Sequence, residues 1–441
     1  MEVRIGRAEY GGAFASSAGP SMPFVLPGEL VEQGEPPVQG LVVLESAPGR
    51  IAPACVHFGA CGGCHYQHAD YGLQLALKQQ LLAGVMADAG LRDLPPLKSL
   101  SGEPWGYRNR IRMRLRVGSG DAIEFGYSVA ATNFFLPVQM CPIAAPLLWR
   151  AVHSLRRLGE TDRRTREWLS AADEVELFCD GDENRLQVQL YLREAGAAVR
   201  EPSGFAVFCE ELRKFVPELA GAAAQLAPEL SRRTRRSWAG VGWGSSGIQY
   251  DVAGQLYWVS RGAFFQVNRS LVGRLVELVA SEAGGDGSGR AWDLYAGVGL
   301  FTRPLAAKVG RVLAVEGAEQ AAADLVAGAQ GGRGWAAYEA ARMPTVDFLR
   351  QQQTQRERPD VVVLDPPRAG LGEEGAALLA RLTPARIVYV SCDPVTLARD
   401  LRVLVASGYR VRAMHMVDLF PQTFHIETVV RLERVDAESG D

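Results

Sequence analysis

The sequence lacks any unbroken apolar run of about 18 residues, so it predicts no membrane-spanning helix. Its N-terminus also lacks the charged-then-apolar pattern of a signal peptide, and we therefore expect a cytoplasmic protein. The net charge of −3 excludes a global basic surface. Any binding of nucleic acid must then come from local basic patches. Nothing in the sequence implies a protein partner.

Cysteine is scarce, because the 441 residues include only seven, too few and too unevenly spread for a disulfide framework. In a reducing compartment, clustered cysteines indicate a metal site, and four have ligand-like surroundings: Cys55, Cys61, Cys64 and Cys141. The first three form Cys-x5-Cys-x2-Cys with glycines between them, and glycine lets the backbone wrap closely around a metal. Spacing alone leaves zinc and an iron–sulfur cluster as alternatives.

The length predicts several domains, since a single hydrophobic core rarely serves so long a chain. We expect three, at residues 1–53, 54–252 and 253–441. In the first domain the sequence predicts short strands at 3–15, 23–31 and 41–47, and these strands fit a small β-barrel. The second is expected to be α+β, with a helix at 71–90 that packs on the third domain.

Strands and helices alternate from about residue 260 onward. This alternation predicts a doubly wound, Rossmann-like α/β domain with a parallel sheet. Short apolar segments predict strands at 291–294, 312–315, 361–364 and 387–390. Helical patterns lie between them, at 271–280 and 376–382.

The first of these strands leads into a glycine-containing turn with Tyr295, Gly297, Gly299 and Leu300. Gly-x-Gly after a strand lets a nucleotide-like ligand approach the backbone, and alone it fits NAD as well as S-adenosylmethionine. The third glycine of the dinucleotide fingerprint is replaced by Thr302, which favours a ligand without a pyrophosphate.

Two acidic residues follow neighbouring strands. Glu316 closes the second strand, where a carboxylate accepts hydrogen bonds from ribose hydroxyls, although a solvated acid at a strand end is the alternative. Asp365 begins the run Asp-Pro-Pro, whose prolines lock an extended turn and aim the aspartate over the carboxyl edge of the sheet. A purely structural turn is the alternative there.

Cys392 lies directly after an apolar strand and directly before a helix. Asp393 is a good N-cap and Pro394 suits the first helical turn, so the pattern predicts a helix that ends near Gly408. The helix dipole favours thiolate over thiol at this position, which predicts a nucleophile. A buried structural cysteine is the alternative.

Glu427 opens the predicted last strand, at 428–432, with apolar residues on both sides. Partial desolvation raises the pKa of such a carboxylate, and it can then act as a base near neutral pH. The alternatives are a salt-bridged glutamate on an edge strand, or His425 as the base.

Five arginines recur with a period of two: Arg108, Arg110, Arg112, Arg114 and Arg116. Apolar residues occupy the other parity from residue 111 to 117, so the pattern predicts a strand with one buried face and one row of guanidinium groups. Such a row matches RNA phosphates, and the alternative is a solvated face offset by acids. A second run, at residues 232–236, is expected in a surface loop.

The ordered motifs F-F-Q-V-N at 264–268, D-L-Y-A-G-V-G at 293–299, D-P-P-R-A-G-L at 365–371, S-C-D-P-V-T-L-A-R-D-L at 391–401 and D-L-F-P-Q-T-F-H-I-E at 418–427 resemble the RNA (uracil-C5)-methyltransferase family. The resemblance covers residues 51–433. It implies methylation of a uridine in structured RNA by S-adenosylmethionine. Cys392 would attack carbon 6 of the uracil, and Glu427 would remove the carbon-5 proton.

The resemblance also assigns ligand roles. Cofactor-contacting positions fall on Gln266, Tyr295, Gly297, Gly299, Leu300, Glu316 and Asp365. The ribosomal-RNA branch of the family carries a 4Fe–4S cluster on the cysteine pattern seen here, with Cys141 as the fourth ligand, and a TRAM (OB-like) barrel at its N-terminus. Both features favour 23S rRNA as the substrate, with the T-loop of tRNA as the alternative.

The chain departs from the resembled family in two places. Asp393 stands where most relatives have Asn, and its added negative charge should slightly oppose a thiolate. Within the segment 335–347 there is no clear polar residue at the place where relatives often contact the adenine. Two further hypotheses remain: an RNA-binding or assembly protein without activity, and a methyltransferase of purine amino groups, which needs no cysteine nucleophile.

Overall fold

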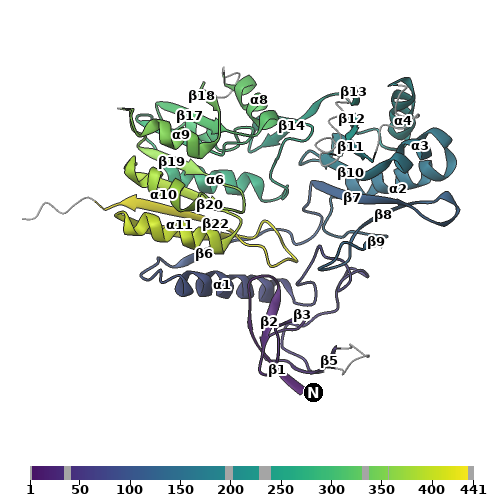
Figure 1. Cartoon of the computed structure of the whole chain (residues 1–441), viewed down its shortest axis with the longest axis horizontal. Helices are drawn as coiled ribbons and strands as arrows, with labels where there is room; N and C mark the ends of the chain where they lie inside the picture. The colour runs from purple at the N-terminus through teal and green to yellow at the C-terminus, as the bar shows by residue number, and fades with distance from the viewer. Residues whose placement is uncertain are drawn as a thin grey trace, which may run out of the picture. The chain divides into compact units, whose positions relative to one another are not determined.

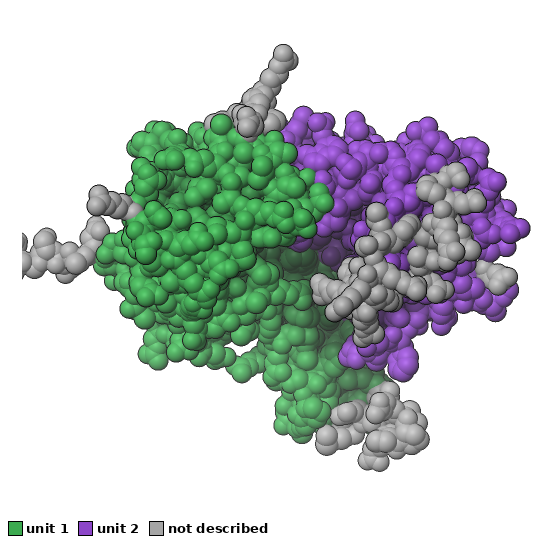
Figure 2. All heavy atoms as spheres, turned by 45° about the horizontal axis from the view of Figure 1, so that its top comes forward, with its two compact units in different colours: residues 1–53, 65–102, 271–441 green, residues 54–64, 103–270 purple. Residues whose placement is uncertain are grey.

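The computed structural model describes residues 2–33, 41–193, 202–227, 240–329, 337–355 and 357–435. Two compact units make up the chain (Figure 2). Unit 1 contains residues 1–53, 65–102 and 271–441, and unit 2 contains residues 54–64 and 103–270. Within the described residues, no helix has the length and apolarity needed to cross a membrane.

The N-terminal part of unit 1 is a five-stranded antiparallel sheet in the order β3-β2-β1-β4-β5. Its strands are β1 (Glu2–Ala8), β2 (Ala13–Ser16), β3 (Met22–Pro23), β4 (Leu30–Gln33) and β5 (Leu41–Glu45). Alternate residues of β1, Val3 and Ile5, are buried, as expected for a sheet with one covered face. They share a core with Tyr66 and Leu77, so this sheet packs on the segment that leads into α1 (Tyr71–Asp88).

The rest of unit 1 is an eight-stranded sheet in the order β18-β17-β16-β19-β20-β22-β21-β6. The first five strands in this order run parallel to one another, and β22 pairs antiparallel with both β20 and β21. The strands are β6 (Leu97–Leu100), β16 (Arg290–Leu294), β17 (Arg311–Glu316), β18 (Glu339–Arg342), β19 (Val361–Leu364), β20 (Arg386–Ser391), β21 (Tyr409–Val417) and β22 (Glu427–Arg434).

Helices cover both faces of this sheet, because residues of both parities in β19 and β20 are fully buried. The helices are α6 (Val272–Ala283), α7 (Thr302–Ala306), α8 (Glu319–Gly328), α9 (Thr345–Gln352), α10 (Gly372–Arg381) and α11 (Pro394–Ala406). The helices α9, α10 and α11 pack side by side, and α1 lies against α11 (Figure 1). The doubly wound sheet predicted from the sequence is thus confirmed, with its strands and with α6, α10 and α11 where the patterns placed them.

Unit 2 is built on a seven-stranded sheet in the order β13-β12-β11-β10-β7-β8-β9. Its strands are β7 (Arg110–Val117), β8 (Ile123–Ser128), β9 (Phe135–Pro137), β10 (Ala172–Cys179), β11 (Leu186–Leu192), β12 (Leu219–Leu226) and β13 (Val241–Gly244). The helices α2 (Pro146–Thr161), α3 (Arg163–Ala171) and α4 (Pro202–Phe215) pack with it, η1 (Ser119–Asp121) is a short 3-10 turn, and β14 (Gly247–Val252) pairs with β15 (Gln255–Ser260). Cys179 and Cys209 are in its core, as expected.

The compact units differ from the three sequential domains expected from the sequence. Residues 65–102 belong with the carboxyl-terminal part, because β6 pairs with β21 and extends the eight-stranded sheet. Residues 253–270 belong to unit 2, because β15 pairs with β14. The pairing of β6 with a strand more than 300 residues later has no local signal in the sequence, and the boundary expected at residue 252 falls inside the β14–β15 hairpin.

Candidate active site

The turn after β16 has the backbone geometry of a ligand-binding loop. Tyr295, Gly297 and Gly299 all have positive φ, at 61°, 58° and 92°. This conformation is uncommon for a tyrosine and costs free energy, and such strain clusters at ligand sites. A Cβ on Gly297 would project into open space, whereas one on Gly299 would lie 3.1 Å from Leu325 Cδ1. Gly297 therefore leaves room for a ligand against the backbone, and Gly299 is required for packing.

Glu316 ends β17 and holds this turn in place. Its Oε2 accepts from the amide of Gly297 at 2.8 Å, and its Oε1 accepts from the amide of Ala318 at 2.6 Å. Each carboxylate oxygen has a second lone pair, so Glu316 can still accept a ligand hydroxyl. The residues Tyr295, Gly297, Leu300 and Glu316 thus form one turn-and-carboxylate arrangement, which fits the nucleoside part of a cofactor.

Asp293, the first residue of the D-L-Y-A-G-V-G motif, is a buried carboxyl group beneath this turn to which the sequence analysis assigned no role. It is fully buried, and Thr302 donates a hydrogen bond to its Oδ2 at 2.5 Å. Burial raises the pKa of Asp293 to about 7, with the charges of Asp365 and Glu316 adding to the shift. Thr302, which replaces the third glycine of the dinucleotide fingerprint, therefore has a structural role, because it binds the Asp293 carboxyl group beneath the turn.

The strand register brings Cys392 and Glu427 together. Ser391 pairs with Thr428 across the antiparallel β20–β22 ladder, so the next residues, Cys392 and Glu427, face each other where β20 ends and β22 begins. Asp365 follows β19, the other neighbour of β20. Three side chains from motifs far apart in the sequence therefore gather at one edge of the sheet.

The electrostatics of this edge differ from the expectation for Cys392. Burial raises the pKa of its thiol to about 12, with the charges of Glu427 and Asp365 adding to the shift and Arg368 and a backbone hydrogen bond opposing it. The thiol is therefore protonated near neutral pH, because burial and the two carboxyl groups oppose the thiolate that a helix dipole favours. Burial and Asp365 also raise the pKa of Glu427, whose Oε1 has no hydrogen-bond partner among the described residues.

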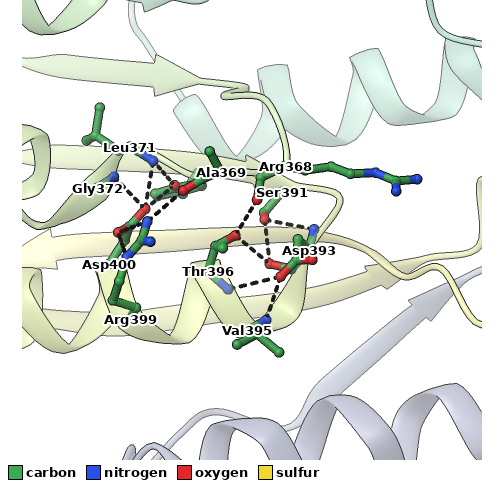
Figure 3. Close-up of polar contacts among 11 residues, drawn as sticks. Arg368, Ala369, Leu371, Gly372, Ser391, Asp393, Val395, Thr396, Arg399 and Asp400 are labelled. Carbon is green, nitrogen blue, oxygen red and sulfur yellow. Dashed lines mark hydrogen bonds and ion pairs between the residues drawn. The ribbon is translucent and has the colours of Figure 1, made fainter. Parts of the chain in front are cut away.

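One helix holds both loops that carry these groups (Figure 3). Asp393 caps α11, as predicted, by accepting from the amides of Val395 and Thr396 at 3.0 Å each. Farther along α11, Thr396 donates to the carbonyl of Arg368 at 3.0 Å. Fully buried Asp400 accepts from the amide of Leu371 at 2.7 Å. The helix that starts after Cys392 thus holds the loop that starts with Asp365.

A second helix holds the loop before Glu427. In α1, Lys78 donates to Asp418 at 2.6 Å and to the carbonyl of Phe420 at 2.9 Å, and the side chains of Lys78 and Asp418 are completely buried. Gln74 exchanges two hydrogen bonds with Gln422, at 3.0 Å each. The prediction that the helix at 71–90 packs on the carboxyl-terminal part is confirmed. The polar side chains of this helix, to which the sequence analysis assigned no role, bind the loop before Glu427.

Gln266 belongs to unit 2, whereas the other predicted cofactor-contacting residues belong to unit 1. It is buried, and its backbone carbonyl accepts from Asn109 Nδ2 at 3.0 Å. Its expected contact with a cofactor stays a prediction.

The four predicted cysteine ligands also belong to unit 2. Cys141 and Cys61 interact electrostatically, as do Cys61 and Cys55, and Tyr127 donates a hydrogen bond to Cys141. Burial raises the pKa of both Cys61 and Cys141. Cys55, Cys61 and Cys141 thus share one neighbourhood, and Cys64 is three residues from Cys61 in the sequence. Across the described ranges, however, no three His, Cys, Asp or Glu residues are arranged to hold a metal ion.

The arginine row is confirmed as a strand, but its charges are paired. In β7 the apolar residues 111, 113 and 115 are buried, and the arginines occupy the other parity. Arg112 Nε donates to Glu174 at 2.8 Å, and Arg116 Nη2 donates to Glu124 at 2.7 Å. Arg110 Nη1 lies 3.6 Å from Glu176, and Arg114 donates to the carbonyl of Asn133 at 2.7 Å.

Arg108 lies before β7, and its charge lowers the pKa of Cys141 and of Tyr127. It therefore faces the cysteine neighbourhood rather than the row. The acids of adjacent strands offset the row, as the alternative interpretation expected. The second basic run, at 232–236, and Trp335 lie outside the described residues.

Comparison with known proteins places these motifs in a family. A family profile described as tRNA (Uracil-5-)-methyltransferase matches residues 336–435. The 23S rRNA (uracil(1939)-C(5))-methyltransferase RlmD of Alkalilimnicola ehrlichii is 33% identical over 408 residues, covering 89% of this chain and 85% of that protein. The RlmD of Cronobacter sakazakii is 32% identical over 405 residues, with 89% and 84% coverage.

The fold also has a solved counterpart. The crystal structure of Pyrococcus abyssi tRNA (uracil-54, C5)-methyltransferase in complex with S-adenosyl-L-homocysteine aligns with a TM-score of 0.71 and 21% sequence identity. The alignment covers 98% of this chain and 100% of that one.

Proposed function

The chain belongs to the RNA (uracil-C5)-methyltransferase family, and from this premise we propose that it methylates carbon 5 of a uridine in 23S rRNA. The RlmD relatives, which match along most of the chain, favour ribosomal RNA. The family profile and the solved counterpart concern tRNA, so a tRNA uridine is the second candidate for the same chemistry.

The observation that supports a covalent mechanism is the apposition of Cys392 and Glu427 across the β20–β22 ladder. In the proposed reaction the Cys392 thiol first loses its proton to solvent. The thiolate sulfur then bonds to carbon 6 of the uracil, and the electrons of the 5,6 double bond move to the carbonyl oxygen at carbon 4. Carbon 5 of this enolate becomes the nucleophile. S-adenosylmethionine would supply the methyl group and leave as the neutral thioether S-adenosylhomocysteine, and before transfer its positive charge would offset the carboxylates of the site. Glu427 then takes the carbon-5 proton, and the carbon–sulfur bond breaks to release the thiolate.

The residues of unit 1 suit these tasks. Tyr295, Gly297, Gly299, Leu300 and Glu316 would hold the cofactor, with Gln266 as a further proposed contact. Glu427 is a strong base once the carboxyl is ionised, because burial raises its pKa and, within the described part of the chain, its Oε1 has no hydrogen-bond partner. Asp365 is placed to contact either the cofactor or the uracil edge.

RNA containing 5-fluorouridine tests this proposal. Fluorine at carbon 5 leaves no proton for Glu427 to remove, so the adduct through Cys392 should persist as a protein–RNA band under denaturing conditions. Cys392→Ala should abolish the band, and Cys209→Ala, which removes a buried thiol of unit 2, should keep it. Fragments of 23S rRNA and tRNA provide the two substrates, and mapping of 5-methyluridine in cells with and without this gene identifies the natural one. If neither RNA traps the wild-type protein, the covalent mechanism is wrong.

We also propose that Cys55, Cys61, Cys64 and Cys141 bind a 4Fe–4S cluster with a structural or RNA-positioning role. Their spacing and their shared neighbourhood support this assignment. Anaerobic purification should give a brown protein with iron and acid-labile sulfide. A colourless protein that contains zinc would overturn the assignment.

The arginines of β7, which are Arg110, Arg112, Arg114 and Arg116, are proposed to contact RNA phosphates, whereas Arg108 faces the cysteine neighbourhood. Arg112 and Arg116 are the most suitable members, because 42% and 53% of their side-chain surfaces are exposed. Phosphate would have to displace the glutamates that now pair with them, so the row should contribute modestly to affinity.

A further inference from the structure

The turn between β1 and β2 contacts the edge of the eight-stranded sheet where Cys392 and Glu427 lie. It contains Tyr10, whose hydroxyl donates a hydrogen bond to Asp393 Oδ2 at 2.9 Å. Asp393 directly follows Cys392, and its other oxygen caps α11. The hydroxyl of Tyr10 is also close enough to Cys392 and Arg368 for electrostatic interaction. A residue from the N-terminal sheet thus completes the hydrogen bonding of the turn that carries the nucleophile.

The same turn touches the loop that carries the base. The ring of Tyr10 packs edge-on against Phe424, with centroids 5.4 Å apart and an interplanar angle of 87°. Phe424 lies three residues before Glu427. Gly12 sits so close that an added Cβ would lie 3.0 Å from both Phe424 Cδ1 and His65 Cδ2. The β1–β2 turn is therefore seated on both catalytic loops.

We propose that Tyr10 is a positioning residue for Cys392, so that a residue next to the N-terminal sheet completes the active site. This inference depends on the proposed function. Its physical basis is that Asp393 must keep one fixed rotamer to cap α11 while its charge lies beside the thiol. The hydroxyl of Tyr10 fixes that rotamer and disperses the charge. Without this donor, the freed oxygen should oppose thiolate formation more strongly and loosen the turn.

Tyr10→Phe removes the hydroxyl and keeps the ring. We expect adduct formation with 5-fluorouridine RNA to slow roughly tenfold at saturating RNA, the scale of a lost hydrogen bond to a charged group. RNA affinity should not change. Alkylation of Cys392 by iodoacetamide should need a higher pH, with Cys392→Ala giving the background. Tyr409→Phe is the matched control, because it removes a buried tyrosine hydrogen bond, to the carbonyl of Pro384 at 2.8 Å, elsewhere in unit 1.

The close packing of Gly12 against Phe424 and His65 is tested by one variant and a matched control. Gly12→Ala introduces the two contacts at 3.0 Å and should slow adduct formation. Gly11→Ala imposes comparable backbone strain, since both glycines have positive φ, but its Cβ meets no atom within 4 Å. In an Asp393→Asn background, Tyr10→Phe should have a smaller effect, because the charge that the hydroxyl disperses is absent.

The outcomes are separable. If wild-type protein forms no adduct with either RNA, the proposed function fails, whatever the Tyr10 variants do. If wild-type protein forms the adduct and Tyr10→Phe matches it in rate and in alkylation pH, the positioning role is wrong. Weaker RNA binding with an unchanged rate at saturation would assign Tyr10 to RNA binding and would also overturn the inference.

Discussion

The sheet edge of unit 1 that carries Cys392 and Glu427 differs from the arginine strand of unit 2 in how its charged side chains are surrounded. On β7 the arginines are partly exposed, and those at 110, 112 and 116 have acidic partners on adjacent strands. At the edge that carries Cys392, Glu427 is buried, its Oε1 has no hydrogen-bond partner among the described residues, and burial and Asp365 raise its pKa. An unpartnered buried atom is not peculiar to this edge, since Arg110 Nε on β7 is another; the raised pKa of Glu427 is what fits the base proposed above.

Glu427→Gln should produce the largest effect, because it removes the proposed base and leaves the shape of the site intact. We expect turnover to fall by about 10²- to 10⁴-fold, the usual contribution of general-base catalysis. The covalent adduct should accumulate with native RNA, since carbon 6 addition does not require Glu427. Gel separation of the protein–RNA adduct and counting of transferred methyl groups measure the two quantities.

Glu433→Gln is the control on the same strand. Its carboxylate lies in surface ion pairs with Arg386 and Arg431, so turnover should be unchanged. Normal turnover in Glu427→Gln would make another group the base and would remove the contrast between the two regions.

Lys78→Met should have the largest effect on stability. It leaves Asp418 completely buried without its cation, and breaking a buried pair costs about 3–5 kcal/mol. Urea denaturation of the whole protein measures the loss. Lys98→Met, at an exposed position of β6, is the control and should change the free energy of unfolding by less than about 0.5 kcal/mol.

Asp418→Asn in the Lys78→Met background should recover part of that stability, because the buried group is then neutral. Equal stability of wild type and Lys78→Met would contradict the structural role of this pair.

Asp365→Asn tests the electrostatics of the thiol. The pKa of Cys392 is raised to about 12, so the thiolate fraction, and with it the alkylation rate, should rise with pH across the range 7–10 without a plateau. Removal of the Asp365 charge lowers the pKa of Cys392, because a neighbouring negative charge opposes the thiolate. At fixed pH the variant should therefore react faster, by up to roughly tenfold, which is one pKa unit. A plateau near neutral pH in wild type would show that the helix dipole prevails over burial.

The sequence predicted elements and motif positions well where the signal was local. Apolar runs and caps identified β19, β20 and α11 within a residue or two, and Asp393 caps α11 as its residue type suggested. Motifs that follow strands of one sheet converge at its carboxyl edge, so the grouping of Asp365 and Cys392 was also predictable.

Contacts between distant segments could not be predicted. The partners of Asp393, Asp418 and Gln422 are Tyr10, Lys78 and Gln74, which lie about 340 to 380 residues away in the sequence and belong to no catalytic motif. The pKa of Cys392 was predicted in the wrong direction for the same reason. The helix dipole is visible in the sequence, whereas burial and the charge of Glu427 depend on the assembled site.

The acids that face the arginine row provide the smallest and most specific test. If phosphate must displace Glu174 from Arg112, then Glu174→Gln should strengthen RNA binding about two- to threefold, while Arg112→Gln should weaken it by a similar factor and reduce the salt dependence by about one phosphate contact. Arg163→Gln is the control, because its exposed pair with Glu167 lies on α3 rather than on the row. Titrations of 23S rRNA fragments at several salt concentrations measure all three variants. If RNA affinity rises in Glu174→Gln and falls in Arg112→Gln, the arginine row is a phosphate site whose affinity is lowered by the neighbouring glutamates. If RNA affinity is unchanged in both variants, β7 is a structural strand and RNA binds to other surfaces.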